Sequence, residues 1–183
     1  SALLRLGPDH PAREDVAAAW TLRVPRVRGG WESMGRAFDR SLDDLGALRM
    51  RSGDNRHPLF AAGMPWFMTV FGRDTAITSL QTLLLGPELA AGALDALAEL
   101  QADAEDPVID AEPGKIVHEV RHGRAADTWF SRYYGSIDST PLFLVLLSET
   151  WRWTDDARLA TRLHEPALRA LEWIDRYGDV DGD

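Results

Sequence analysis

Two apolar segments with helical character meet at Gly86-Pro87, and this junction constrains the fold more than any other feature of the sequence. Residues 75–85 are nearly all apolar, and residues 87–102 begin with proline and continue mostly in alanine and leucine. Glycine followed by proline ends a helix, and proline at the first position of the next helix costs no hydrogen bond. The sequence therefore predicts two helices in direct succession.

Apolar residues recur at helical spacing in three more segments. Residues 141–154 predict a buried helix and residues 156–177 a longer amphipathic one. Residues 31–50 place one stripe of apolar side chains on a helix, made of Met34, Phe38, Leu42, Leu45 and Leu48. We therefore expect an all-α fold, with residues 1–183 forming a single domain.

Two choices of residue within these helices carry predictions of their own. Pro166 lies inside the pattern of residues 156–177, where it is expected to kink or split the helix. Trp151 and Trp153 lie at the far end of the 141–154 segment, away from the groups that could carry chemistry, and we expect them to pack in the core.

The chain between the helices has a different character. Residues 57–72 contain aromatic residues and glycine without a helical period, which predicts extended, strand-like chain. Residues 103–137 form a connection longer than packing requires, and such loops are usually functional or disordered. Because this loop carries tyrosines, a tryptophan and several charges, we favour a functional loop.

Composition excludes several classes of function. The net charge of −9 disfavours a nucleic-acid partner, and the absence of cysteine excludes a disulfide framework, a thiol nucleophile or a thiolate metal site. No apolar stretch approaches the roughly 20 residues that a membrane span needs. No leader segment and no phosphate-binding glycine loop are apparent, so we expect a cytoplasmic protein without a cofactor.

The first candidate site is the motif "MPWFMTVFGRDTAI", which contains Trp66, Arg73 and Asp74. Asp74 could simply cap the helix that follows, with Arg73 as its ion-pair neighbour. Alternatively, a guanidinium and a carboxylate can hydrogen-bond neighbouring sugar hydroxyls while an indole packs on the C–H face of the ring. The residues of this motif leave the two interpretations equal.

The second candidate is "GKIVHEVRHG" at residues 114–123, where His118, Glu119, Arg121 and His122 gather. The letters H-E-V-R-H have the spacing of a zinc-binding H-E-x-x-H motif, but that motif needs a helix and this segment lies in the connection between helices, so we expect no metal site. The segment is either a solvated loop or a Glu119–Arg121 pair that faces substrate.

The third candidate is Asp138 in "YYGSIDSTP", next to Tyr133 and Tyr134. Thr140, followed by Pro141, is expected to cap the helix, which leaves Asp138 free to point elsewhere. A carboxyl group at the mouth of an apolar helix is expected to have a raised pKa because it is desolvated, as a general acid requires.

The last residues, 179–183, read "DVDGD" and resemble the opening of a calcium loop. The later ligands of such a loop and its closing glutamate are missing, so a turn rich in aspartate and glycine is the favoured interpretation. In either case we expect the chain to be part of a longer protein.

Taken in order, "AGMPWFMTVFGRDTAI", "GKIVHEVRHG" and "YYGSIDSTPLFLVLL" resemble the bacterial amylo-α-1,6-glucosidase family, the glucosidase part of glycogen-debranching proteins. "FGRD" is also similar to the sugar-holding pair of glucoamylases, and "SIDSTP" to the acidic segment of trehalases and mannosylglycerate hydrolases. The resemblance extends over roughly residues 10–183.

The resemblance implies an (α/α)6 barrel and inverting hydrolysis of an α-glucosidic bond in an oligosaccharide, with Asp138 as the general acid. It further implies that Arg73 and Asp74 hold the terminal sugar against Trp66. Glu119, Arg121 and Tyr134 are additional candidates for lining the same pocket.

An inverting enzyme also needs a carboxylate base about 6.5–9.5 Å from the acid. The family places that base on a late helix, which we expect this chain to lack, because it would supply only the N-terminal part of the barrel. Uncovered inner helix faces would then favour self-association.

Two other classes of function stay open. One is a non-catalytic helical carbohydrate-binding or scaffold module in which Asp74 and Asp138 are helix caps. The other is a helical-repeat interaction protein, which the unequal helix lengths disfavour. The motifs also leave open whether the linkage is α-1,6, α-1,4 or trehalose-like.

Overall fold

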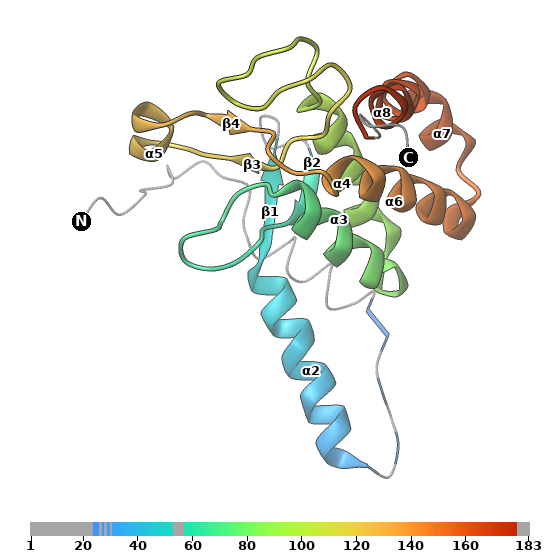
Figure 1. Cartoon of the computed structure of the whole chain (residues 1–183). Helices are drawn as coiled ribbons and strands as arrows, with labels where there is room; N and C mark the ends of the chain where they lie inside the picture. The colour runs from blue at the N-terminus through green and yellow to red at the C-terminus, as the bar shows by residue number, and fades with distance from the viewer. Residues whose placement is uncertain (1–23, 26, 28, 30, 53–56, 179–183) are drawn as a thin grey trace, which may run out of the picture. The chain divides into compact units, whose positions relative to one another are not determined.

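The computed structural model describes residues 24, 25, 27, 29, 31–52 and 57–178. More than half of these residues are helical, and the strands form two small two-stranded sheets (Figure 1). The chain divides into two compact units, Ser1–Ala47 and Leu48–Asp183, which we describe separately. A division into compact units does not show that either unit folds independently. The prediction that residues 1–183 form a single domain is therefore untested. The acidic segment 179–183 lies outside the described residues.

In the first unit, helix α2 spans Glu32–Ala47. It is amphipathic, as its apolar stripe predicts, but within the unit only Leu42 of its described residues is buried. Pairs one turn apart join Arg36 to Glu32 at 3.3 Å and Arg40 to Asp44 at 3.1 Å. The helix ends three residues before the predicted limit because Arg49–Ser52 forms a strand instead.

The second unit begins with an antiparallel strand pair, β1 (Arg49–Ser52) and β2 (His57–Phe60). Arg49 pairs with Phe60 at one end of the ladder and Ser52 with His57 at the other. Leu59 and Phe60 are fully buried, and β2 packs on helix α4. The extended chain that we predicted from residue 57 is therefore confirmed for β2.

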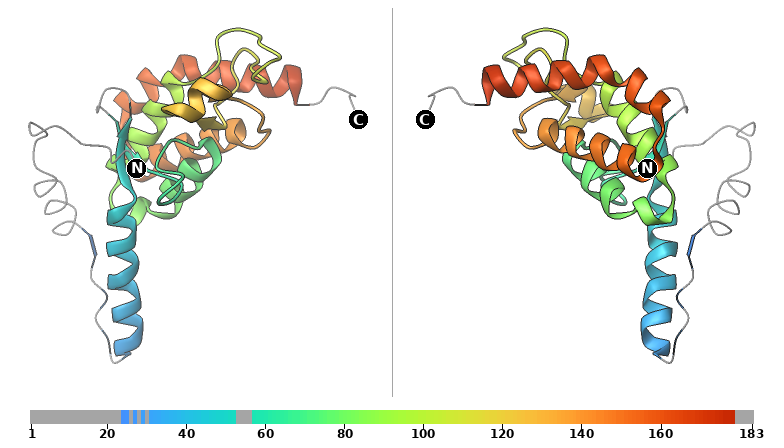
Figure 2. Two further views of the ribbon diagram at one scale, coloured as in Figure 1. Left: turned by 90° about the vertical axis from the view of Figure 1, so that its left-hand side faces the viewer. Right: turned by 90° about the vertical axis from the view of Figure 1, so that its right-hand side faces the viewer.

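Helices α3 (Gly72–Gln81), α4 (Pro87–Glu99) and α6 (Ser139–Thr154) pack on one another and form the core of this unit (Figures 1 and 2). A short 3₁₀ helix at Leu83–Leu85 follows α3. The junction at Gly86-Pro87 is confirmed, with Pro87 in the first turn of α4. The side chains that fill the core include Leu59, Val70, Leu94, Leu97, Phe143 and Leu146.

The last helical segment is split, as Pro166 predicts, into α7 (Ala157–Arg162) and α8 (His164–Tyr177). The break falls at Leu163, which lies one turn before the proline nitrogen, where that nitrogen cannot donate the helical hydrogen bond. Both helices contact α6.

The prediction that Trp151 and Trp153 pack in the core is wrong. Their exposed fractions are 49% and 60%. From Thr140 on, the buried residues of α6 recur every three or four positions and end at Thr150, so Trp151 and Trp153 lie off the face that packs on the core.

The long connection is ordered and contains three short elements, β3 (Glu119–Val120), α5 (Arg124–Thr128) and β4 (Arg132–Tyr133). The sequence predicted only a loop here. Ile116 and Val117 are fully buried beside α6, and a backbone bond joins Ala102 N to Lys115 O at 2.9 Å. This connection therefore belongs to the core as well as to the surface.

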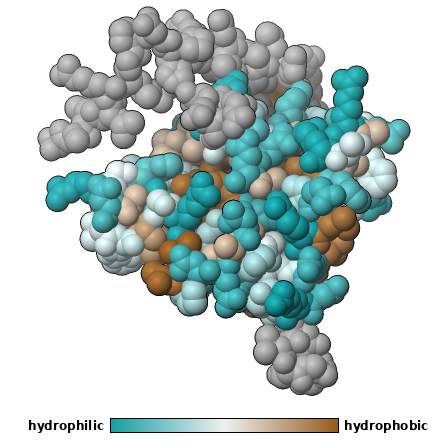
Figure 3. All heavy atoms as spheres, turned by 90° about the horizontal axis from the view of Figure 1, so that it is seen from above, coloured by the Kyte–Doolittle hydropathy of each residue, from teal (hydrophilic) through white to brown (hydrophobic). Residues whose placement is uncertain are grey.

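No helix in the described ranges is both long and apolar enough to cross a membrane. On the face drawn in Figure 3, hydrophobic residues lie in small groups between hydrophilic ones. The fold is thus mostly helical, as predicted. Closure of these helices into a barrel is taken up below as a proposal.

Candidate functional site

Helix α3 begins earlier than predicted because Gly72 fits where no side chain could. A Cβ on Gly72 would lie 2.0 Å from Val117 O and 2.7 Å from Ser139 Oγ. This close approach joins the start of α3 to the start of α6 and to the segment before β3. As a result, Arg73 and Asp74 lie in the first turn of α3, and Asp74 is not the N-cap, which is Phe71.

Asp138 is the N-cap of α6, which begins at Ser139. Its carboxylate accepts none of the N–H groups of that helix, so it is free to point elsewhere, as predicted. It accepts a hydrogen bond from the Ser136 hydroxyl. Thr140 was predicted as the cap, which is wrong, because its Oγ1 accepts a hydrogen bond from Ile116 N at 2.9 Å.

The two motifs meet at Arg73 and Asp138. Arg73 Nη1 lies 3.4 Å from Asp138 Oδ2, and Arg73 Nε lies 4.0 Å from Asp74 Oδ2. The side chains of Arg73 and Asp138 are 48% and 40% exposed, so solvent and a ligand can reach both. The fold therefore gathers one guanidinium and two carboxylates at the start of α3 and α6.

Asp138 does not have the raised pKa that we expected. Its partial burial acts to raise the pKa, but the hydrogen bond from Ser136 and the charge of Arg73 outweigh that effect. The pKa of Asp138 is therefore lowered from its ordinary value. The expectation considered desolvation alone and omitted the guanidinium that the fold brings to the carboxylate.

Glu119 and Arg121 form the second part of the site. Arg121 Nε donates to Glu119 Oε1 at 2.8 Å and Nη2 donates to Oε2 at 2.9 Å. Both side chains are largely buried, and the hydrogen bonds that Arg121 donates to Glu119 raise the pKa of Arg121. The pair predicted from the sequence is thus formed and held in a fixed plane.

A backbone ladder connects this pair to Arg73. Gly72 N donates to His118 O at 2.9 Å, and Val120 N donates to Val70 O at 3.0 Å. On the other side, β3 pairs with β4, so Glu119 faces Tyr133. The central segment at residues 118–121 therefore has a neighbour on each side, and the three candidate motifs form one continuous surface.

Aromatic rings follow the same ladder, and sequence reasoning missed most of them. The Arg121 guanidinium carbon lies 4.7 Å from the ring centroids of both Trp129 and Phe130. Phe130 stacks on Tyr133 at 4.9 Å, and Phe67 meets Phe71 edge to face at 5.8 Å. The sequence feature that could have indicated them is the adjacent pair Trp129-Phe130, within the connection that is predicted to be functional.

Trp66 and Tyr134 are placed very differently. The Trp66 side chain is 84% exposed, on the loop that leads to Phe67 and α3. Tyr134 is buried at 3% exposure, and its hydroxyl donates to Leu100 O at 2.8 Å, so the structure does not bring it to the surface of the site. Tyr133 lies there instead, and a hydrogen bond to the Asp110 carboxylate raises its pKa.

Among the described residues, no group of three histidine, aspartate or glutamate side chains is placed to hold a metal ion. The imidazole of His118 meets Phe71 and Tyr133 edge to face, each at 6.0 Å between ring centroids. In this structure it serves as part of the aromatic packing.

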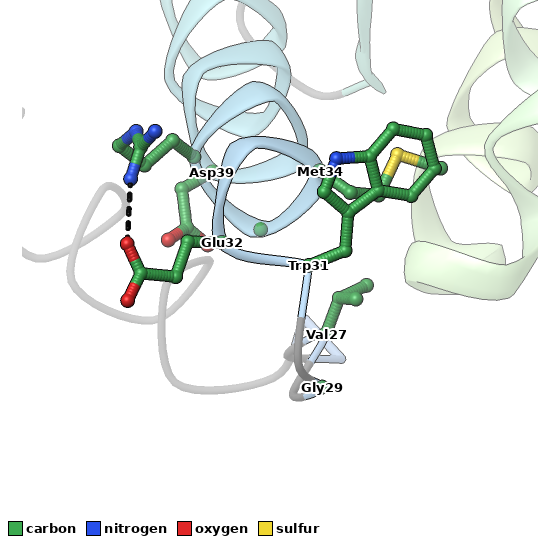
Figure 4. A pocket seen from close by; sticks show the side chains of 8 residues that line it. Val27, Gly29, Trp31, Glu32, Met34 and Asp39 are labelled. Atoms are coloured by element: carbon green, nitrogen blue, oxygen red, sulfur yellow. Dashed lines mark hydrogen bonds and ion pairs between the residues drawn. The ribbon is translucent and has the colours of Figure 1, made fainter.

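A separate hollow of about 540 Å³ lies in the first unit, at the start of α2 (Figure 4). Trp31 and Met34 contribute apolar surface to its lining, and the bonded pair Glu32–Arg36 contributes charge (Figure 4). None of the residues predicted for the site line it, and its polar groups are surface charges on one helix. We therefore assign the candidate site to the second unit.

Comparison with known proteins identifies no family. No protein-family model matches this chain, and no curated protein matches it.

Proposed function

We propose that this chain carries the general acid and the sugar-holding residues of an inverting glycoside hydrolase that acts on α-1,6-glucosidic bonds of glycogen-like oligosaccharides. The observation that supports this most directly is the contact of Arg73 with Asp138 at 3.4 Å. These residues come from two motifs 65 positions apart, and both remain half-exposed at the start of buried helices. Exposed pairs contribute little to stability, and this position leaves both groups available to a ligand.

The proposal gives each group of the site a role. Arg73 and Asp74 hydrogen-bond neighbouring hydroxyls of the terminal sugar, and the exposed indole of Trp66 packs on its C–H face. Asp138 donates a proton to the oxygen of the bond that breaks. The Glu119–Arg121 pair binds a further part of the glycan through N–H groups and lone pairs that its internal bonds leave free.

Asp138 must carry a proton in order to act as the acid, whereas Arg73 and Ser136 favour its ionised form. The proposal therefore requires a bound sugar to draw Arg73 into hydrogen bonds with its hydroxyls and to desolvate Asp138, which would raise the pKa. A carboxylate base, brought near in the complete site, would raise it further. We assign no base here, because Glu119 is held by Arg121 at 2.8 Å.

The fold belongs to the same proposal. We propose that the packed helices α3, α4, α6, α7 and α8 form the N-terminal part of an (α/α)6 barrel, with the site at the N-terminal ends of α3 and α6. What supports this is the mutual packing of successive helices, with the connection 103–137 running to the site. We also propose that the protein acts in the cytoplasm, where glycogen-like glucans are found.

A second function is favoured by one specific observation. Because the pKa of Asp138 is lowered, the free chain presents a carboxylate next to Arg73. That arrangement binds sugar hydroxyls without any chemistry, so the alternative is a non-catalytic carbohydrate-binding module.

The test compares wild type with Asp138→Asn, using the protein as its gene encodes it. Two substrates are used, panose, which contains one α-1,6 bond, and α-glucosyl fluoride, whose leaving group departs without a proton. We expect Asp138→Asn to lower kcat on panose by about 10²–10⁴-fold, the usual contribution of a general acid, and to lower it far less on the fluoride. Asp155→Asn, at the other end of α6, is the matched control and should retain activity on both.

An equal loss on both substrates would show that Asp138 is not the acid. Panose binding without hydrolysis by wild type would establish the binding module instead. Failure of wild type to bind panose, measured by calorimetry, would overturn both functions.

A further inference from the structure

We propose that Trp129 is a second sugar-stacking residue, and that the glycan bound here is an extended oligosaccharide that reaches from Arg73 to Trp129. This inference rests on the proposed function and specifies its substrate class. It goes beyond the residues that the sequence predicted, none of which is Trp129.

The indole of Trp129 has the surface that a sugar ring could cover. Trp129 is 70% exposed even though the Arg121 guanidinium lies 4.7 Å from its ring centroid. One face of the ring is therefore next to a cation and the tilted Phe130 ring lies 6.4 Å away between centroids, while most of the side chain stays open to solvent. Such an exposed ring is costly in water, since an indole gains by covering apolar surface.

The Arg121 guanidinium next to the Trp129 ring is itself fixed by its neighbours. Arg121 is fixed by two bonds to Glu119 and also contacts Phe130, which stacks on Tyr133 of β4. Because Trp129 contacts both Arg121 and Phe130, it has less conformational freedom to lose when a ligand binds than an indole without such neighbours. Preorganised aromatic rings bind more tightly for that reason.

The groups around the ring supply hydrogen-bonding capacity. Arg121 has N–H groups beyond the two that bond Glu119, and each Glu119 oxygen has a further lone pair. The surface therefore combines an apolar plate with donors and acceptors at its edge. A pyranose ring has the complementary arrangement, with C–H groups on its faces and hydroxyls around its rim.

Arg121, which contacts Trp129, is separated from Arg73 along the ladder. Gly72 pairs with His118 and Val70 with Val120, so Arg73 and Arg121 lie at opposite ends of the ladder. The three intervals between His118 and Arg121 span roughly 10 Å of backbone at about 3.3 Å each. A single sugar cannot contact both ends, whereas a chain of several sugars can.

Phe71, Glu119 and Tyr133 are direct partners across neighbouring segments, so their side chains share one face of the ladder. That face connects the two ends. Strand β3, which begins the β3–α5–β4 segment that carries Trp129, is bridged through Glu119 to Phe71 at the end of the loop that carries Trp66.

The experiment measures binding of a short and a long glycan by calorimetry. Panose is the short ligand, and maltoheptaose carrying one α-1,6-linked glucose is the long one. We expect Trp129→Ala to weaken binding of the long ligand by about two- to tenfold, as loss of one aromatic contact does, and to leave panose binding unchanged. Trp129→Phe should restore most of the loss.

Trp153→Ala is the matched control, since this indole is similarly exposed but lies at the far end of α6. Equal effects of Trp129→Ala on both ligands, or none on either, would overturn the extended site while leaving the proposed function intact. Failure of wild type to bind either ligand would instead remove the proposed function and this inference with it. Circular dichroism of each variant separates a binding loss from a folding loss.

Discussion

Asp138 and Arg73 form an ion pair that solvent reaches, and this exposure limits what the pair can do for stability. Exposed pairs contribute about 0.2–1 kcal/mol in general. The pair is therefore better suited to positioning a ligand than to holding two helices together. Its effect on stability should nevertheless be visible as a dependence on pH.

The direction of this pH dependence follows from the lowered pKa of Asp138. A depressed pKa in the folded state adds stability above the unfolded-state pKa, about 3.9, and that stability is lost as the pH falls through the folded-state value. We expect wild type to be more stable than Asp138→Asn at pH 7, with the difference vanishing in strong acid. Urea unfolding at a series of pH values measures it, and a difference that grows in acid would contradict the assignment.

Gly72 is the residue on which the geometry of the site depends. In Gly72→Ala the new Cβ would meet Val117 O at 2.0 Å and Ser139 Oγ at 2.7 Å, so the start of α3 must move away from the segment before β3 and from α6. We expect a loss of about 1–3 kcal/mol of unfolding free energy, or more, and weaker glycan binding because Arg73 moves from Asp138.

Gly63→Ala is the matched control for this change. Its Cβ would find only the Phe67 ring at 3.9 Å, an ordinary contact. Chemical denaturation of the two variants gives the comparison, and equal stability would show that α3 and α6 can separate without cost.

At the scale of elements, the sequence predicted which helices exist better than where they begin. The Gly86-Pro87 junction and the break caused by Pro166 depend on local chemistry, which the sequence displays directly. The starts of α3 and α6 depend instead on how closely Gly72 approaches Ser139, a contact between distant segments. Such a contact leaves no periodic pattern to read.

The sequence likewise predicted some residues of the candidate site and missed others. Arg73, Asp138 and the Glu119–Arg121 pair were predicted because charged residues stand out within apolar motifs. The structure pairs Arg73 with Asp138 and Arg121 with Glu119. Trp129 was missed because its neighbour Arg121 is eight positions away. Tyr134 was assigned to the site through the family resemblance, but it is buried, since one residue along from Tyr133 the side chain points to the opposite face.

The connection 103–137 is tied to helix α8 by one buried cluster. Lys115 Nζ lies 3.1 Å from Glu112 Oε2, which also accepts a hydrogen bond from Trp173 Nε1 at 2.7 Å. Lys115 Nζ donates to Asp110 O at 3.0 Å as well and lies 5.5 Å from the Trp173 ring centroid. The cluster therefore links the loop to the helix through both charge and hydrogen bonding.

We expect the two charged members of this cluster to differ in importance. Glu112→Ala leaves a buried ammonium and an indole N–H without their carboxylate, a change that costs about 3 kcal/mol. Lys115→Met should cost less, because Glu112 keeps its bond to Trp173 and is partly exposed. Urea unfolding ranks the two, and a larger loss for Lys115→Met would show that the ammonium, rather than the carboxylate, holds the loop.

At the scale of the whole molecule, exposed apolar side chains and net charge act in opposite directions. Leu168 and Leu171 lie three residues apart on α8, and both are about half-exposed, as Trp151 and Trp153 are on α6. We propose that these helices mediate self-association. The net charge of −9 opposes it, so association should increase with salt.

Sedimentation velocity at low and high salt provides the test. We expect Leu171→Glu to shift the protein toward monomer at every salt concentration, because it places a charge on the apolar face. Thr161→Glu adds the same charge to the exposed side of α7 and should have little effect. A wild type that stays monomeric at high concentration and high salt would rule out association through α8.

Lys115 is the only lysine of the chain, and its amine is enclosed by Glu112, Asp110 and Trp173. An acylating reagent can therefore modify this side chain only when the loop detaches from α8. The rate of acylation at Lys115, measured by mass spectrometry, therefore reports how often that detachment occurs. If glycan binding orders the connection that carries Trp129, acylation of Lys115 should be slower in the presence of the glycan.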